Sequence, residues 1–342
     1  MALRPKLEFF RFSLESKDEV YKTFRDFAIE EFNQRRSSSD AQIMTKLFSH
    51  FMSNLVTKKA KVNHLKKQLK LIKNSANKYL THQPKVDISK NLIYGVINGG
   101  RFGRDGMMSD SRPDVDEGAA FGKNKTILRY YYFLLYLPLD YHEGCLIVHS
   151  NSKQETITDV FKMYIGRLFS GANYRCPTIS MFCPKAFQDE FKEHAIVKSL
   201  EFKHTCTDAN VFTSEGYVVD NLQYDVKVEI TPHTGNTMLQ NRGAINRVLQ
   251  LMGLAGNRNV IYLGDFGTQK ITMRDMITKS DRTFNLSDEE LNIVPVVYLK
   301  DRIVHYNDDD TPDFLELDAL AKNLLQYEIL PEIRPDLYEN EE

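Results

Sequence analysis

The stretch ILRYYYFLLYLPLDYHEGCLIVHS, residues 127–150, decides the fold of this chain. Tyr130 to Leu137 is an unbroken run of tyrosine, phenylalanine and leucine, which favour strands. Pro138 ends the run, residues 140–144 have the composition of a turn, and Cys145 to His149 is a second short apolar run. Two such runs joined by a short polar loop predict a hairpin. A buried helix is the competing interpretation, but the short length and the aromatic content argue against it.

A strand as apolar as this one is typical of a sheet that is buried on both faces, so we expect helices to cover it. The segments that follow alternate between the apolar spacing of helices and the composition of strands. Residues 156–169 and 185–194 have helical spacing of apolar side chains, whereas residues 178–182 and 195–204 have the composition of strands. The order predicts an α+β fold with a mixed or antiparallel sheet and covering helices.

The composition indicates an ordinary globular protein. With 342 residues and 42% hydrophobic side chains, the chain can form one large domain or two smaller ones. None of its four cysteines belongs to a C-x-x-C pair, so we expect reduced core cysteines in a cytoplasmic protein. The N-terminus lacks a signal-peptide core, and no apolar run reaches the ~20 residues of a membrane helix. We expect neither a membrane partner nor a cofactor.

The net charge of −1 hides an asymmetry between the two ends of the chain. Residues 41–84 contain nine lysines and neither Asp nor Glu. Residues 305–342 contain twelve acidic residues against Lys322 and Arg334. Such a division indicates a polyanion-binding segment and an acidic tail.

The N-terminal part is predicted to be helical. Ser16 and Glu19 match a capping box for a helix over residues 16–36, and Asp40 can cap a second helix. From Lys61 to Tyr79 the apolar spacings alternate between three and four, as in a packed helical hairpin. We therefore predict four parts: a lysine-rich helical segment (1–84), an α+β domain (85–210), a second α+β part (211–330) and an acidic tail (331–342).

The lysines of the first part have two interpretations. They can form a solvated face of a helical bundle, or they can contact phosphates. Solvated helix faces usually mix both signs of charge, and this one does not, which favours phosphate. The candidate nucleic-acid contacts in this segment are Lys58, Lys59, Lys61, Lys66, Lys67, Lys70 and Lys73.

A second candidate anion site follows the predicted strand 91–98. Residues 99–106 read GGRFGRDG and combine four glycines with Arg101 and Arg104. Glycines let backbone amides converge on an anion, and arginine can hold phosphate with two hydrogen bonds. The loop matches neither a Walker loop nor a dinucleotide fingerprint. A tight hairpin turn is the alternative interpretation.

The hairpin FLLYLPLDYHEGCLIVHS, the helix after it and the following strand–helix–strand unit resemble in layout the DNA-binding sensor protein of the phage lambda Rex exclusion system, and also uncharacterised proteins linked to phage defence. The resemblance covers residues 127–305. It implies DNA binding, a homodimer, a role in antiviral defence and a possible partner protein of the same system. The lysine-rich segment and the Gly-Arg loop lie outside it.

One motif suggests an enzyme instead. Residues 215–231 predict a hairpin around Asp220-Asn221, in which Asp225, Lys227 and Glu229 share a strand face. A D-x-K pair of this kind can hold Mg²⁺ and stabilise developing charge in a metal-dependent nuclease. Alternating charges on the solvent side of a strand are the common alternative.

The remaining segments are assigned from periodicity. We predict a helix over residues 237–254, a hairpin over 293–305, a helix over 315–327 and a poorly ordered tail beyond Ile329. Cys145 and His149 share an alternation and are expected to be core residues.

The sequence as a whole favours a non-enzymatic protein that binds nucleic acid, with duplex DNA as the expected form. One alternative is a Mg²⁺-dependent nuclease. The other is an interaction module whose basic face docks an acidic partner or its own tail.

Overall fold

The computed structural model forms two compact units. The first contains residues 1–184 and 296–342, and the second contains residues 185–295. The boundaries predicted at 84/85 and 210/211 therefore do not coincide with those of the units. The structure describes residues 5–18, 21–75, 77–109, 118–152, 155–208, 211–212, 218–219, 222–231, 253–255, 260–262, 268–275, 281–285, 297–299 and 302–338.

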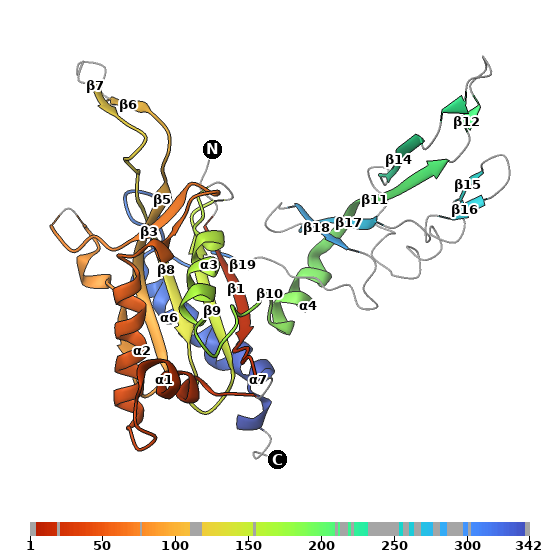
Figure 1. Ribbon diagram of the computed structural model, residues 1–342. Helices are drawn as coiled ribbons and strands as arrows, with labels where there is room; N and C mark the ends of the chain where they lie inside the picture. Colours follow the sequence, from red (N-terminus) through yellow and green to blue (C-terminus); the bar gives the residue numbers. More distant parts are fainter. Residues whose placement is uncertain are drawn as a thin grey trace. The chain divides into compact units, whose positions relative to one another are not determined.

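A nine-stranded antiparallel sheet forms the centre of the first unit (Figure 1). Its main path runs β10-β1-β9-β8-β5-β3-β2, with β19 also paired to β1 and β4 to β5. The strands are β1 (Lys6–Ser13), β2 (Lys61–Val62), β3 (Lys67–Lys70), β4 (Lys85–Asp87), β5 (Leu92–Arg101), β8 (Arg129–Tyr136), β9 (Glu143–Ser150), β10 (Ile179–Phe182) and β19 (Val297–Tyr298).

The predicted hairpin is confirmed and lies inside this sheet. Strands β8 and β9 pair antiparallel, with Phe133 opposite Val148 and Tyr136 opposite Cys145. Strand β5 flanks the hairpin on one side and β1 on the other. The two strands are paired on both edges and covered on both faces. Their sequences are therefore largely apolar and aromatic.

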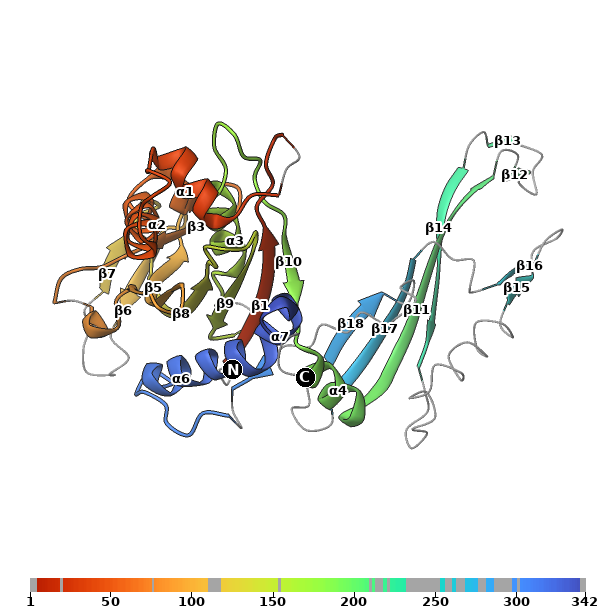
Figure 2. The ribbon, with the colours of Figure 1, turned by 90° about the horizontal axis from the view of Figure 1, so that it is seen from below.

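Helices cover both faces of the sheet, as predicted (Figure 2). On one face the ring of Phe133 lies 5.2 Å from that of Phe51 and 5.1 Å from that of Phe161. On the other face the next residue along the strand, Tyr132, donates a hydrogen bond of 2.8 Å to Asp318. The covering helices are α1 (Phe24–Phe32), α2 (Asp40–Asn54), α3 (Thr158–Leu168), α6 (Phe314–Leu324) and α7 (Leu330–Ile333).

The remaining elements of the first unit are short. The π-helical turn η5 (Leu325–Ile329) joins α6 to α7, and the 3-10 turns are η1 (Lys58–Ala60), η2 (Leu80–His82) and η6 (Pro335–Leu337). Strands β6 (Gly106–Ser109) and β7 (Gly118–Phe121) pair with each other in a ribbon that extends beyond the end of β5 (Figure 1).

The second unit is built on a four-stranded antiparallel sheet of order β14-β11-β17-β18. Helix α4 (Lys185–His194) leads directly into β11 (Ala195–Asp208), which confirms the predicted helix and strand. The sheet continues with β14 (Leu222–Ile230), β17 (Thr268–Asp275) and β18 (Asp281–Asn285). Two short ribbons pair β12 (Val211–Phe212) with β13 (Val218–Val219), and β15 (Gly253–Ala255) with β16 (Val260–Tyr262).

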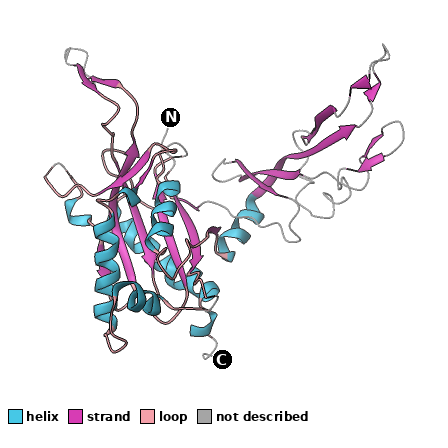
Figure 3. Cartoon of the chain, in the orientation of Figure 1, coloured by secondary structure: helices cyan, strands magenta, loops and turns pink. Residues whose placement is uncertain are grey.

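The α+β class is confirmed, and Figure 3 shows helices packed against strands in the first unit. The first helix, however, begins later than predicted. Thr23 caps α1, and its side chain forms the capping box with Asp26. Ser16 instead lies in a bridge with Tyr174. Ser39, one residue before the predicted Asp40, caps α2 and forms a capping box with Gln42.

The helix predicted from Lys61 to Tyr79 is wrong. The chain forms β2, turns at residues 63–66 and returns as β3. Lys66 has a φ of 51° at the end of that turn, which is incompatible with a continuous right-handed helix. The apolar spacing misled the prediction because Val62 and Leu69 enter the same core from two different strands.

Three C-terminal predictions need correction. Strand β14 pairs with β11 and β13 pairs with β12, so residues 215–231 do not form one hairpin. Strand β19 pairs with β1, and the described residues 302–305 form no return strand. Residues 237–252 of the helix predicted over 237–254 lie outside the described part, and Gly253-Leu254 belongs to β15.

The predicted disordered tail is wrong for residues 330–338, which form α7 and η6. The guanidinium of Arg334 is 2% exposed and pairs with Asp140 at 3.0 Å and Asp336 at 2.8 Å. This contact attaches the segment to the loop of the β8–β9 hairpin. The helix predicted over residues 315–327 is confirmed as α6 and η5, with Asp313 as its N-cap.

Candidate nucleic-acid interface

The two predicted anion-binding segments lie side by side. Strand β3 pairs antiparallel with β5, which places Lys67 opposite Arg101 and Gln68 opposite Gly100. Beyond the paired residues, the amide of Phe102 donates to the carbonyl of Lys66 at 2.9 Å. Residues separated by more than thirty positions in the sequence thus lie side by side near one edge of the sheet, where β2 is the last strand.

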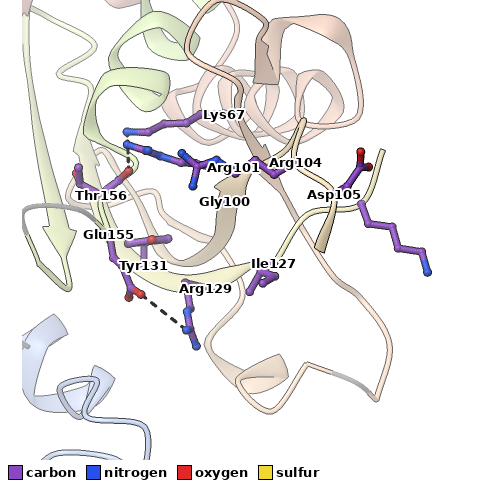
Figure 4. Close-up of a pocket in the computed structure, with 11 residues that line it drawn as sticks. Lys67, Gly100, Arg101, Arg104, Asp105, Ile127, Arg129, Tyr131, Glu155 and Thr156 are labelled. Carbon is purple, nitrogen blue, oxygen red and sulfur yellow. Dashed lines mark hydrogen bonds and ion pairs between the residues drawn. The ribbon is translucent and has the colours of Figure 1, made fainter. Parts of the chain in front are cut away.

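A cavity of about 420 Å³ opens beside this pair of strands (Figure 4). Its walls come from β3, the end of β5, the segment that leads into β8, and the residues just before α3. We call it the edge pocket. Its lining residues are Lys67, Gly100, Arg101, Arg104, Asp105, Lys125, Ile127, Arg129, Tyr131, Glu155 and Thr156.

Five of the lining side chains are basic and two are acidic. Arg129 pairs with Glu155 at 3.7 Å, and both of these side chains are more than one-third exposed. Among the residues that the structure describes, no ion pair engages Arg101, Arg104 or Lys125. The pocket therefore presents three uncompensated cations and a fourth whose own ion pair is long and solvated.

Lys67 differs from the other predicted lysines because it is buried. Its ammonium donates to both carboxylate oxygens of Asp159 at 2.8 Å and to the carbonyl of Thr156 at 3.0 Å. The residue is only 5% exposed. The prediction that Lys67 is a free phosphate contact is therefore wrong: its charge is used to join β3 to the start of α3, behind the pocket.

The other predicted lysines lie in η1, in β2 and β3 or in the residues next to these strands, and none of them lines the pocket. Lys58 and Lys59 belong to η1, and the ammonium of Lys61 lies 4.3 Å from the centre of the Phe102 ring. The exposed lysines of the edge are Lys58, Lys61, Lys66, Lys70 and Lys73. These five form the surface that we call the lysine edge.

The glycines next to Arg101 serve close packing. A Cβ at Gly99 would overlap the side chain of Ile157, and one at Gly100 would overlap the carbonyl oxygen of Ile127. Gly103 has a φ of 86°, and its amide donates to Lys123. The amides of Phe102 and Gly103 are therefore already used and cannot also bind an anion, whereas the side chains of Arg101 and Arg104 can.

Sequence analysis missed two basic residues of the pocket. Lys125 and Arg129 lie in the segment KNKTILR, residues 123–129, which leads into β8. Four exposed cations belong to the pocket: Arg101, Arg104, Lys125 and Arg129. The signal was the density of positive charge just before the apolar run, but only the pairing of β5 with β8 brings Arg129 opposite Gly99.

Tyr131 forms the apolar side of the pocket together with Ile127. Burial, and secondarily the negative charge of Glu155, raise the pKa of Tyr131 well above its ordinary value. Its phenol is therefore neutral at physiological pH and adds no negative charge to the site. Ile127 is 53% exposed and supplies the accessible apolar surface of the pocket.

The D-x-K motif is arranged as an ordinary solvated strand face. Asp225, Lys227 and Glu229 are all exposed on one side of β14, as predicted. Asp225 pairs with Lys203 at 2.8 Å, and Lys227 pairs with Glu201 at 3.0 Å, both across to β11. Within the described ranges no group of three or more His, Cys, Asp and Glu side chains could hold a metal ion. The geometry gives the nuclease hypothesis no support.

Cys145 and His149 are core residues. Both are fully buried on β9, and burial raises the pKa of the Cys145 thiol. Neither ring nitrogen of His149 has a hydrogen-bond partner among the described residues, and burial lowers its pKa to about 3. Cys183 is buried as predicted, whereas Cys176 is exposed, contrary to the prediction. The side chain of Cys206 lies outside the described part of the chain.

None of the described helices has the length and apolarity of a membrane-crossing segment. No protein-family model, no curated protein and no solved structure matches this chain.

Proposed function

We propose that this protein binds nucleic acid through the lysine edge and the edge pocket. The observation that carries the proposal is the meeting of two basic segments at one edge of the sheet, where β3 pairs with β5. Phosphate backbones attract such surfaces without regard to sequence, and release of condensed counterions supplies much of the affinity. Arginine is suited to the phosphate oxygens because its guanidinium can donate two parallel hydrogen bonds.

An acidic protein partner is supported less well. Stable protein interfaces have an apolar core in which charged residues are depleted. Here Ile127 is the one large apolar side chain of the pocket that is more than half exposed, and it is surrounded by cations. The chain's own tail is an equally poor occupant over its described part, because Asp336 is already paired with Arg334.

The form of nucleic acid and the biological setting belong to the same proposal. Duplex DNA, a homodimer and a role in antiviral defence rest on the resemblance in layout to the Rex sensor protein. They add no residue to the interface, and the electrostatic argument holds for DNA and RNA alike.

A salt titration tests the proposal. Fluorescence anisotropy with labelled duplex and single-stranded DNA should show binding at low salt that weakens steeply as salt rises. The logarithmic slope should be about −0.9 for each phosphate contact on duplex DNA. Reversing Lys58, Lys66, Lys70 and Lys73 to glutamate should weaken binding at least tenfold and reduce the slope.

Lys46→Glu is the matched control, because Lys46 is exposed on α2 and lines neither surface. It should leave binding within about twofold. Thermal unfolding of all variants should match that of the unchanged protein. No binding at low salt, or full binding by the folded quadruple variant, would overturn the proposal.

A further inference from the structure

The edge pocket is open to solvent, and its volume limits what can enter it. A volume of about 420 Å³ lies within the range of small-molecule sites, roughly 300–1,000 Å³. A double helix can lie across its mouth but cannot enter it. A single nucleotide that projects from the end of a strand has a suitable size.

The charge at the mouth exceeds the needs of one internal phosphate. Arg101, Arg104 and Lys125 have no ion pair within the described part of the chain, and Arg129 has only the long contact to Glu155. An internal phosphodiester carries one negative charge, whereas a phosphomonoester carries about 1.5 to 2 at neutral pH and has three free oxygens. The four cations exceed the two lining carboxylates, Asp105 and Glu155, by two charges, which matches the second group better.

The cavity also has an apolar side. Ile127 and Tyr131 line it next to the arginines, and Figure 4 shows both on the strand segment opposite Lys67 and Arg101. Tyr131 is only 2% exposed, so the exposed Ile127 side chain and the guanidinium planes are the surfaces that can accept a base or sugar without selecting a sequence. A site for inorganic phosphate alone would not need this surface.

We infer that the edge pocket binds a nucleotide phosphomonoester, the phosphorylated terminal nucleotide of a nucleic-acid strand. The inference rests on the proposed function and gives the pocket a role distinct from that of the lysine edge. The lysine edge holds the internal backbone, and Arg101, Arg104, Lys125 and Arg129 hold the terminal phosphate. Lys67 and Asp159 fix the back wall. Glu155 repels the phosphate and must release Arg129 when the phosphate binds.

The test compares strand ends. Labelled single-stranded oligonucleotides of one sequence carry a phosphate at the 5′ end, at the 3′ end or at neither, with the fluorophore placed internally. Anisotropy at physiological salt should show that one phosphorylated end binds at least fivefold more tightly than the hydroxyl form. The double variant Arg101→Gln with Arg129→Gln should abolish this preference and retain salt-sensitive binding of the unphosphorylated strand.

Glu155→Gln should change the affinity for the phosphorylated strand in the opposite direction. Removing the competing carboxylate should tighten binding of the phosphorylated strand by severalfold, and by more than it tightens binding of the unphosphorylated strand. Lys46→Gln should change neither. A general loss of structure cannot produce a gain in affinity that is larger for one ligand.

Adenosine monophosphate as a competitor distinguishes a strand end from a free nucleotide. If it displaces the phosphorylated strand only at millimolar concentration, the strand end is the occupant; if micromolar concentrations suffice, a free nucleotide is the occupant and the strand-end assignment is overturned. Equal affinity for all three strands would overturn the inference while the proposed function stands, whereas no binding of any strand at low salt would overturn both.

Discussion

The Lys67 ammonium and the Asp159 carboxylate form an ion pair of 2.8 Å between residues 92 positions apart, with the lysine side chain 6% exposed and the aspartate 42%. The pair joins strand β3 to the first turn of α3 beside the edge pocket. An unpaired charge is costly only where water cannot reach it. Because the two partners differ in exposure, removing one of them should therefore cost more stability than removing the other.

Asp159→Asn should therefore destabilise the protein more than Lys67→Met. Loss of the carboxylate leaves a buried ammonium with only the Thr156 carbonyl, at a cost of about 1–3 kcal/mol. Loss of the lysine leaves a carboxylate that water can solvate. Urea unfolding of both single variants and the double variant measures the coupling. Asp105→Asn, at the exposed pair with Lys123, is the control and should cost less than about 0.5 kcal/mol.

Arg334 should be necessary for the C-terminal segment to dock. Its guanidinium also lies 4.6 Å from the centre of the Tyr141 ring, so alanine removes two ion pairs and a stacking contact. We expect Arg334→Ala to cost about 2–3 kcal/mol in the free energy of unfolding. Asp336→Asn should cost less, because Asp140 still holds the arginine. Equal stability of Arg334→Ala and the unchanged protein would contradict this role.

Acidification should destabilise the protein through His149. Burial lowers the folded-state pKa to about 3 from its ordinary value of 6.5, so below pH 6.5 the unfolded chain binds a proton that the folded chain does not. The contribution is fully present above pH 6.5 and declines at about 1.4 kcal/mol per pH unit as pH falls towards 3. Between about pH 7.5 and about pH 5.5 the loss is about 1.4 kcal/mol. His149→Phe should remove this component, which unfolding curves at the two pH values can measure; an unchanged slope would contradict the assignment.

Gly100→Ala should damage the edge pocket. The added methyl group would overlap the carbonyl oxygen of Ile127, so β5 and the segment leading into β8 must separate. We expect a cost of about 1–3 kcal/mol and weaker binding of a phosphorylated strand. Gly122→Ala is the matched control, since its Cβ would meet only Asp105 at 3.9 Å. Thermal unfolding and anisotropy of the two variants should differ; similar behaviour would refute the packing argument.

The sequence by itself determined the elements whose signals are local. The run Tyr130 to Leu137 is too apolar for any exposed position, so it predicted a strand buried on both faces, and β8 is that strand. The helical periodicity around residues 156–169 was likewise sufficient for α3, because its buried side chains repeat on one face. The α+β class followed from the order of such segments.

Only the tertiary structure decided which charged side chains are buried in ion pairs and which are exposed. Nothing local separates Lys67, which is buried against Asp159, from Lys66 and Lys70, which are exposed. The same is true of Arg129, which reaches the edge pocket because β5 pairs with both β3 and β8. Periodicity reports which side of an element is apolar, but the register between strands sets which charges meet, and that register depends on contacts between residues far apart in the chain.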